Sequence, residues 1–212
     1  MQAQSNISKI FDEWAPHYDQ EVIDGRGFPF EGYEVVLDAI VQESEALPGM
    51  GVLDLGIGTG NLASRFVSLG CQVWGVDFSP EMLRLAREKF PSGVTLLQAD
   101  LLGDWPTGID RRFGRIVSAY VFHEFDLTTK INLLRKLASD HLAAGGRIVI
   151  GDIAFPTRGA LAAARRRWKE QWDEEYYWIV DETLPAFQTL GLTIAYEQIS
   201  SCAGVITMVP SG

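Results

Sequence analysis

The sequence predicts an α/β fold in which a mostly parallel sheet is covered by helices on both faces. Strand-like and helix-like patterns alternate along the chain, a glycine-rich turn follows the first strand, and acids end the first three strands at equal spacing. Alternation of this kind is typical of parallel sheets with crossover helices. The expected strands lie at about 51–55, 72–77, 94–98, 115–120 and 146–151, and the helices between them near 60–69, 80–89 and 129–143.

The helix ends follow from local residue chemistry. Ser79 offers a side-chain cap, Pro80 stands where no N–H is needed, and Glu81 places a carboxylate near the positive helix end. Glycines at 145–146 are expected to close the third helix near residue 144, because glycine readily adopts the left-handed conformation found after helix ends.

The two ends of the chain add to this central pattern. Two helical stretches, about 6–20 and 32–46, precede the first strand and flank a turn-rich segment at 24–30. After the fifth strand we expect helices at about 158–175 and 182–190, then a terminal hairpin of strands at 192–197 and 205–209. Seven strands result, in one domain over 1–212, with 1–48 as an N-terminal helical segment able to cover a ligand and 49–212 as the core.

Composition excludes several classes of function. The 212 residues are 47% hydrophobic and 22% charged, enough for one α/β domain with a full core. A net charge of −10 repels phosphate backbones and anionic bilayers, so nucleic acid and membrane are not expected partners. Cys71 and Cys202 fit reduced thiols, and no signal segment or membrane span is recognisable, which indicates a cytoplasmic protein. We expect it to be a monomer or homodimer.

Three glycines and three acids mark a ligand site. Gly56, Gly58 and Gly60 alternate directly after the first strand, where a backbone without Cβ atoms lets a ligand lie on the main chain. The acids Asp54, Asp77 and Asp100 are 23 residues apart in both steps, about one strand-helix unit each. They should therefore stand side by side at the carboxyl edge of the sheet, where open α/β sheets bind ligands.

These motifs resemble those of the class I S-adenosylmethionine-dependent methyltransferases. The resemblance rests on Asp-Leu-Gly-Ile-Gly-Thr-Gly at 54–60, the acid ending strand two, Ala-Asp at 99–100 and Ser-Ala-Tyr-Val-Phe-His at 118–123. The segment Phe-Asp-Glu-Trp-Ala-Pro-His-Tyr-Asp-Gln at 11–20 is similar to a YrrT-like group of small bacterial methyltransferases. The resemblance implies a Rossmann-like sheet of seven strands with an antiparallel last strand, S-adenosylmethionine as cofactor, and a small-molecule acceptor.

The chemistry of this cofactor fits the same residues. One carboxylate, Asp77, can accept both ribose hydroxyls, and Asp100 suits the exocyclic amine of adenine, with the N–H of Leu101 facing a ring nitrogen. Asp54 would orient the glycine loop or meet the methionine ammonium, although the acids could also be helix caps or solvated loop ends. Further candidate cofactor contacts are Phe78 and Tyr120 at the ends of strands two and four, and Trp14 and Tyr18 of the N-terminal segment.

Four further side chains are candidates near the reacting methyl. His123 follows strand four and could accept a proton from an acceptor, or only shape the pocket. Glu124 could bind a cationic substrate or be a solvated loop acid. Trp14 and Tyr18 lie four residues apart on one helical face, and could close over the sulfonium or simply hold their helix to the domain.

Two other functions remain open from the residues. A nicotinamide-dependent oxidoreductase also has a glycine loop and a later acid, but its third glycine position is Asn61 here and Asp100 has no role in it. A non-catalytic S-adenosylmethionine sensor would keep all three acids. No metal site or triad is expected, because the three histidines are dispersed and methyl transfer chiefly needs proximity and a dry pocket.

Overall fold

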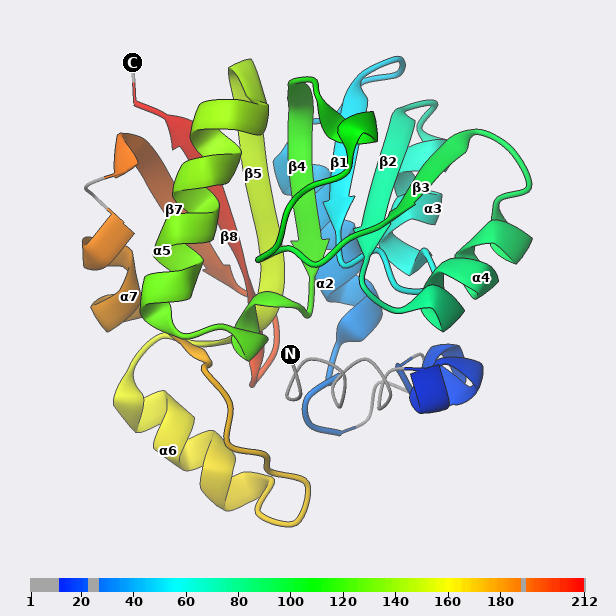
Figure 1. The fold of residues 1–212 in the computed structure, drawn as a ribbon. Coiled ribbons are helices and arrows are strands. Elements are labelled where there is room, and N and C mark those ends of the chain that lie inside the picture. The colour runs from blue at the N-terminus through cyan, green and yellow to red at the C-terminus, as the bar shows by residue number, and fades with distance from the viewer. Residues whose placement is uncertain (1–11, 23–26, 188–189, 212) are drawn as a thin grey trace.

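A twisted sheet forms the centre of the protein, with seven strands along its main path and a short eighth strand, β6 (Trp178–Ile179), paired with β5 (Figure 1). The computed structural model describes residues 12–22, 27–187 and 190–211. The strand order is β3-β2-β1-β4-β5-β8-β7, all parallel except β8, which is antiparallel to both of its neighbours. This confirms the predicted sheet. The strands are β1 (Gly51–Leu55), β2 (Gln72–Asp77), β3 (Val94–Gln98), β4 (Phe113–Ala119), β5 (Leu142–Phe155), β7 (Leu192–Gln198) and β8 (Ala203–Pro210).

Helices cover both faces of the sheet. In Figure 1, α5 lies in front of the sheet, and α2 and α3 lie behind it. Side chains of β1 alternate between two hydrophobic clusters, since Val52 packs with α2 and α3 whereas Leu53 packs with α5. The helices are α2 (Tyr33–Ser44), α3 (Asn61–Ser68), α4 (Pro80–Lys89), α5 (Leu127–Lys136), α6 (Arg158–Arg167) and α7 (Val180–Phe187).

The prediction for the third crossover helix was wrong at its end. The helix α5 continues as a short π-helical segment, η3 (Leu137–His141), and β5 already begins at Leu142. The β4–β5 register shifts between residues 113 and 115, so the glycines at 145–146 sit in an irregularity of β5 and do not cap a helix. A Cβ at Gly146 would lie 2.8 Å from the carbonyl oxygen of Ala143, which explains the need for glycine there.

The expected long helix at 158–175 was also wrong. Helix α6 ends at Arg167, and the chain returns to place β6 (Trp178–Ile179) beside β5, a strand that the sequence pattern did not indicate. Aromatic packing stabilises this return, because Trp172 stacks on Phe28 with ring centroids 4.7 Å apart.

The N-terminal segment lies beyond the carboxyl ends of the strands. Residues 12–22 are helical and lie near the start of α4 in Figure 1. The predicted turn between the two N-terminal helices falls partly outside the described residues. Within the described ranges, no helix has the length and apolar character needed to cross a membrane.

Candidate active site

The glycine loop after β1 is shaped by close contacts. Gly56 has a φ of 67°, and a Cβ there would lie 2.4 Å from a methyl of Val121. Gly58 has a φ of 54°, and a Cβ added to it would meet nothing within 4 Å, because this residue faces a cavity. Gly60 is the N-cap residue of α3. The loop therefore presents bare main chain to the cavity, as the sequence predicts.

Asp77 closes β2 and connects the glycine loop to the next helix. Its carboxylate accepts hydrogen bonds from the N–H of Gly58 at 2.8 Å and of Ser79 at 2.9 Å. Burial raises the pKa of Asp77 to about 6, although these N–H donors favour the charged form. The side chain lines the cavity and is positioned by two backbone donors.

Asp54 lies on β1 and is almost completely buried. Its Oδ2 has no hydrogen-bond partner within the part of the chain that the structure describes. Burial, and then the nearby charge of Asp77, raise the pKa of Asp54 well above its ordinary value. A buried carboxylate oxygen left unpaired beside a ligand loop suits a cationic ligand group.

The cavity has a volume of about 390 Å³ and runs from the glycine loop to the segment that follows β4. Asp100 is exposed at its rim and accepts the N–H of Leu102 at 2.9 Å. The predicted residues that line this cavity are Tyr18, Gly56, Gly58, Asp77, Phe78, Asp100, Leu101, Tyr120 and Glu124. The structure thus brings together most of the predicted site, whereas Asp54, Gly60, Trp14 and His123 lie outside the wall itself.

Aromatic side chains form the roof of the cavity. Trp14 packs edge-to-face on Tyr18 with centroids 4.8 Å apart, and so supports a residue that does line the cavity. Tyr120 is buried, has a φ of 55° and stacks on Tyr33. Its hydroxyl has no partner among the described residues. A non-glycine residue held in this backbone region at a cavity is a feature of functional sites.

Two acids of the N-terminal helix bind the loops beside the cavity. Asp12 accepts the hydroxyl of Ser79 at 2.6 Å. Asp19 accepts the hydroxyl of Thr59 at 2.5 Å and the amide of Asn61 at 3.0 Å. Sequence reasoning missed these contacts, although the acids are seven residues apart and therefore lie on one helical face.

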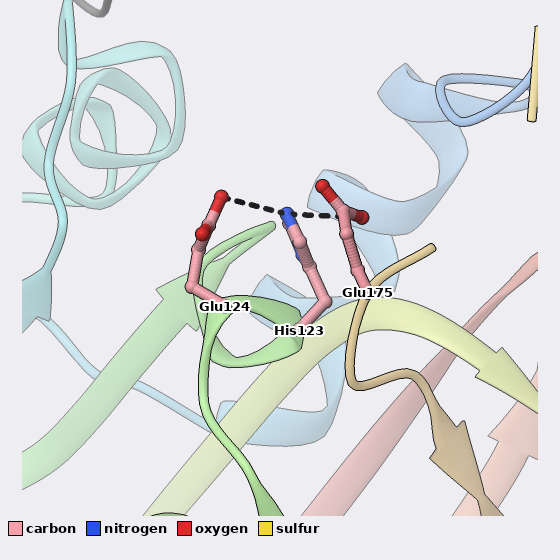
Figure 2. Close-up of side chains that lie close together, drawn as sticks. All are labelled: His123, Glu124 and Glu175. Carbon is pink, nitrogen blue, oxygen red and sulfur yellow. Dashed lines mark ion pairs between the residues drawn. The ribbon is translucent and has the colours of Figure 1, made fainter. Parts of the chain in front are cut away.

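A second polar group lies at η2 (Phe122–Glu124), where Glu124 lines the cavity, and Figure 2 shows three of its side chains. The Nδ1 of His123 lies 2.6 Å from Oδ1 of the buried Asp152, whose Oδ2 accepts the indole N–H of Trp178 at 2.9 Å. The Nε2 of the ring lies 3.9 Å from a carboxylate oxygen of Glu124 and 4.0 Å from one of Glu175. Burial opposes protonation of the ring, but these acids outweigh it, Asp152 foremost, and raise the pKa of His123.

Lys130 of α5 holds the two loops of this group together. Its ammonium is buried and donates to the carbonyl oxygens of Phe125 and Tyr176. Burial lowers the pKa of Lys130 to about 8. The N–H of Tyr176 also donates to the carbonyl of His123 at 2.9 Å. Glu175 is thereby fixed beside His123.

Sequence reasoning missed three members of this group: Asp152, Glu175 and Lys130. An acid inside the apolar run of β5 was a usable signal for Asp152, since a buried carboxylate requires partners. Nothing in the pattern distinguished Glu175 from its exposed neighbour Glu174, which pairs with Arg165.

Comparison with known proteins identifies related sequences. Residues 52–146 match the family described as "Methyltransferase domain". An uncharacterized methyltransferase of Oceanobacillus iheyensis is 30% identical over 210 residues, covering 93% of this chain and 94% of the relative. Another from Bacillus cytotoxicus is 32% identical over 209 residues, covering 92% of this chain and 94% of the relative.

Solved structures share the fold. The structure described as "DhpI-SAM-HEP complex" is similar with a TM-score of 0.74 and 18% identity, covering 98% of this chain and 97% of that chain. A TehB-like SAM-dependent methyltransferase from Corynebacterium glutamicum has a TM-score of 0.65 and 21% identity, covering 95% of this chain and 98% of that chain.

Proposed function

This chain belongs to the methyltransferase family of its sequence relatives, and we propose that it transfers a methyl group from S-adenosylmethionine to a small-molecule acceptor. The observation that carries the proposal is the cavity at the carboxyl edge of the sheet, where the glycine loop, Asp77 and Asp100 converge. Solved structures of the same fold are described as complexes with SAM or SAH, which supports the choice of cofactor.

The cavity residues fit the parts of this cofactor. Asp77 would accept the two ribose hydroxyls, and Asp100 with the N–H of Leu101 would bind adenine. The glycine loop would contact the methionine end, whose ammonium offers a charge partner for the unpaired oxygen of Asp54. Phe78 would pack against the cofactor from the end of β2.

The reaction itself needs positioning more than acid-base machinery. S-adenosylmethionine supplies a methyl group already activated on a sulfonium. The protein must align the acceptor and exclude water, which can carry most of the rate. Tyr18 closes one side of the cavity, with Trp14 behind it, so we assign the N-terminal helix the role of a lid. His123 is the candidate proton acceptor, since Asp152 orients its ring.

The partners follow from charge and cavity size. A cavity of about 390 Å³ has room for little beyond the cofactor, which favours a small acceptor. The net charge of −10 argues against nucleic acid and anionic membranes. Both cysteines are free thiols, which supports a cytoplasmic location, and we expect a monomer or homodimer.

Calorimetry with S-adenosylhomocysteine and with NAD tests the cofactor. We expect S-adenosylhomocysteine to bind more tightly, because the chain offers an acid for the adenine amine and lacks the third glycine of the dinucleotide fingerprint at Asn61. Adenosine serves as a matched fragment that should bind more weakly than S-adenosylhomocysteine. Tighter binding of NAD would overturn the proposal, and mass-spectrometric turnover with pooled small acceptors distinguishes an enzyme from a sensor.

A further inference from the structure

We propose that the methyl acceptor is a small amine, bound in its ammonium form between Glu124 and Glu175, with His123 as the group that takes its proton. The inference rests on the proposed methyl transfer and names its substrate class. It is carried by the geometry of three side chains that converge beside the cofactor cavity, shown in Figure 2.

The spacing of the three polar atoms leaves room for a cationic ligand. A tetrahedral nitrogen whose N–H groups donate over about 2.8 Å holds its acceptors roughly 4.6 Å apart. A zinc-like metal with ligands at about 2.1 Å holds them only about 3.4 Å apart. The nitrogen of His123 and the oxygens of Glu124 and Glu175 all lie within 4.8 Å of one another, with two separations of 3.9 and 4.0 Å. The separations of 3.9 and 4.0 Å lie between the two ideal values, so the spacing admits either ligand and the test must distinguish them.

Asp152 fixes which nitrogen of the histidine faces the ligand. Its buried carboxylate accepts from Nδ1 of His123 and is held in place by the indole of Trp178. With the proton on Nδ1, the lone pair of Nε2 points toward the two glutamates. An aspartate behind a histidine orients a general base in the same way in hydrolases.

The ammonium site borders the cofactor cavity at Glu124, the one of its three side chains that lines the cavity. Glu124 and Phe125 line that cavity together with Tyr120, whose buried hydroxyl has no partner among the residues described. The aromatic rings provide an apolar wall for the carbon chain of an amine. Lys130 donates to backbone carbonyls next to Glu124 and Glu175 and so ties together the two loops that carry them. Binding at Glu124 would place the amine next to the methyl of a cofactor held in this cavity.

The reaction balances with these groups alone. The bound ammonium gives one proton to Nε2 of His123, which frees a lone pair on nitrogen. That lone pair forms the new N–C bond as the C–S bond breaks and its electron pair returns to sulfur. The products are a methylated ammonium, S-adenosylhomocysteine and one proton, which His123 releases to solvent.

A bound ammonium and the protonated ring of His123 compete for the same carboxylates. Around His123 lie Asp152 from β5, Glu124 on η2 and Glu175 before β6, with Lys130 of α5 behind Asp152. In the free protein these acids raise the pKa of His123. An ammonium that neutralises both glutamates lowers the pKa of His123. The ring then loses its own proton and is free to accept one from the amine.

Nuclear magnetic resonance of nitrogen-labelled histidine tests the proposal without knowledge of the exact acceptor. The chain has only three histidines, His17, His123 and His141, so one ring can be followed in protein saturated with S-adenosylhomocysteine. The probes are propylammonium, propanol and propionate, matched in carbon chain, and the chlorides of magnesium, manganese and zinc. The variants are Glu124→Gln and Glu175→Gln, with Glu170→Gln as an exposed control.

We expect millimolar propylammonium to shift the His123 resonances and lower the pKa of that ring, while propanol and propionate do not. Each cluster variant should weaken this response roughly tenfold or more, the worth of a hydrogen bond between charged groups, and Glu170→Gln should leave it unchanged. An unperturbed His123, an equal response in the cluster variants, or tighter binding of a metal ion would overturn the amine site. Binding of S-adenosylhomocysteine, measured separately by calorimetry, tests the proposed function independently.

Discussion

Replacing Asp77 by asparagine should separate cofactor affinity from folding. The carboxylate ends β2 and can accept two ribose hydroxyls as an anion, and asparagine keeps its shape without its charge. Loss of one hydrogen bond to a charged group costs about 1.5–3 kcal/mol, so affinity for S-adenosylhomocysteine should fall about 10- to 150-fold near pH 7.5.

The effect on stability can be worked from the pKa of Asp77. Its folded-state value is about 6 and its ordinary value 3.8, a difference worth about 3 kcal/mol. The folded protein binds more protons than the unfolded chain between these values, so this group lowers the free energy of unfolding as pH rises from about 4 to about 6. Asparagine removes that cost at pH 7 but leaves one backbone N–H of Gly58 or Ser79 without an acceptor, at about 1–3 kcal/mol. The removed ionisation cost and the lost hydrogen bond nearly cancel, so the free energy of unfolding at pH 7 should change little.

Cofactor affinity should increase with pH over the range in which the contribution of Asp77 to stability decreases. Ribose hydroxyls favour the ionised carboxylate, so affinity of the unmodified protein should weaken as pH falls below about 6, by about tenfold per pH unit at most. The assay is calorimetry from pH 5 to 8 on the unmodified protein, Asp77→Asn and the exposed control Asp110→Asn. The reasoning is refuted by an Asp77→Asn protein with unchanged affinity, or with the same pH dependence as the unmodified protein.

Three further predictions concern the lid, the buried lysine and a glycine of β2. The double variant Asp12→Asn with Asp19→Asn should weaken S-adenosylhomocysteine binding several-fold in calorimetry, because each loses charge-assisted hydrogen bonds to a cofactor loop; unchanged binding would contradict the lid. The pKa of Lys130 is about 8 in the folded protein and 10.5 in its ordinary state, so the unfolded chain binds more protons between these pH values. The contribution of this group to the free energy of unfolding should therefore rise by about 3 kcal/mol as pH increases over that range. Urea unfolding should show this rise with pH in the unmodified protein but not in Lys130→Met. Parallel curves of unfolding free energy against pH for the two proteins would refute the prediction. Gly75→Ala should cost about 1–3 kcal/mol of unfolding free energy in the same assay, since its Cβ would lie 2.1 Å from Ile57, and an unaltered midpoint would show that the loop adapts.

Sequence patterns predicted the sheet and the cofactor end of the site because both depend on local chemistry. The alternation of strand-like and helix-like patterns located the parallel strands. Asp77 ends β2 as expected, whereas Asp100 follows the end of β3 by two residues and still lines the cavity. The failures came where tertiary contacts decide. The glycines at 145–146 are typical of a helix end, but the pairing of β5 with β4 places them inside a strand.

The acceptor end of the site was only partly predictable. His123 and Glu124 follow a recognisable strand, whereas Glu175 is about 50 residues further along and reaches them through the return of the chain after α6. That return depends on Trp172 packing against Phe28, a contact between distant segments that has no local signal.

The two acids that bind the N-terminal helix to the cofactor loops have a kinetic consequence. Asp12 contacts Ser79 after β2, and Asp19 contacts Thr59 and Asn61 at the glycine loop, so the N-terminal helix can move away from the cavity only after these hydrogen bonds break. We expect this opening to be slower than the chemical step. We expect a first turnover that is faster than the steady state, and retention of S-adenosylhomocysteine that makes the enzyme sensitive to its own by-product.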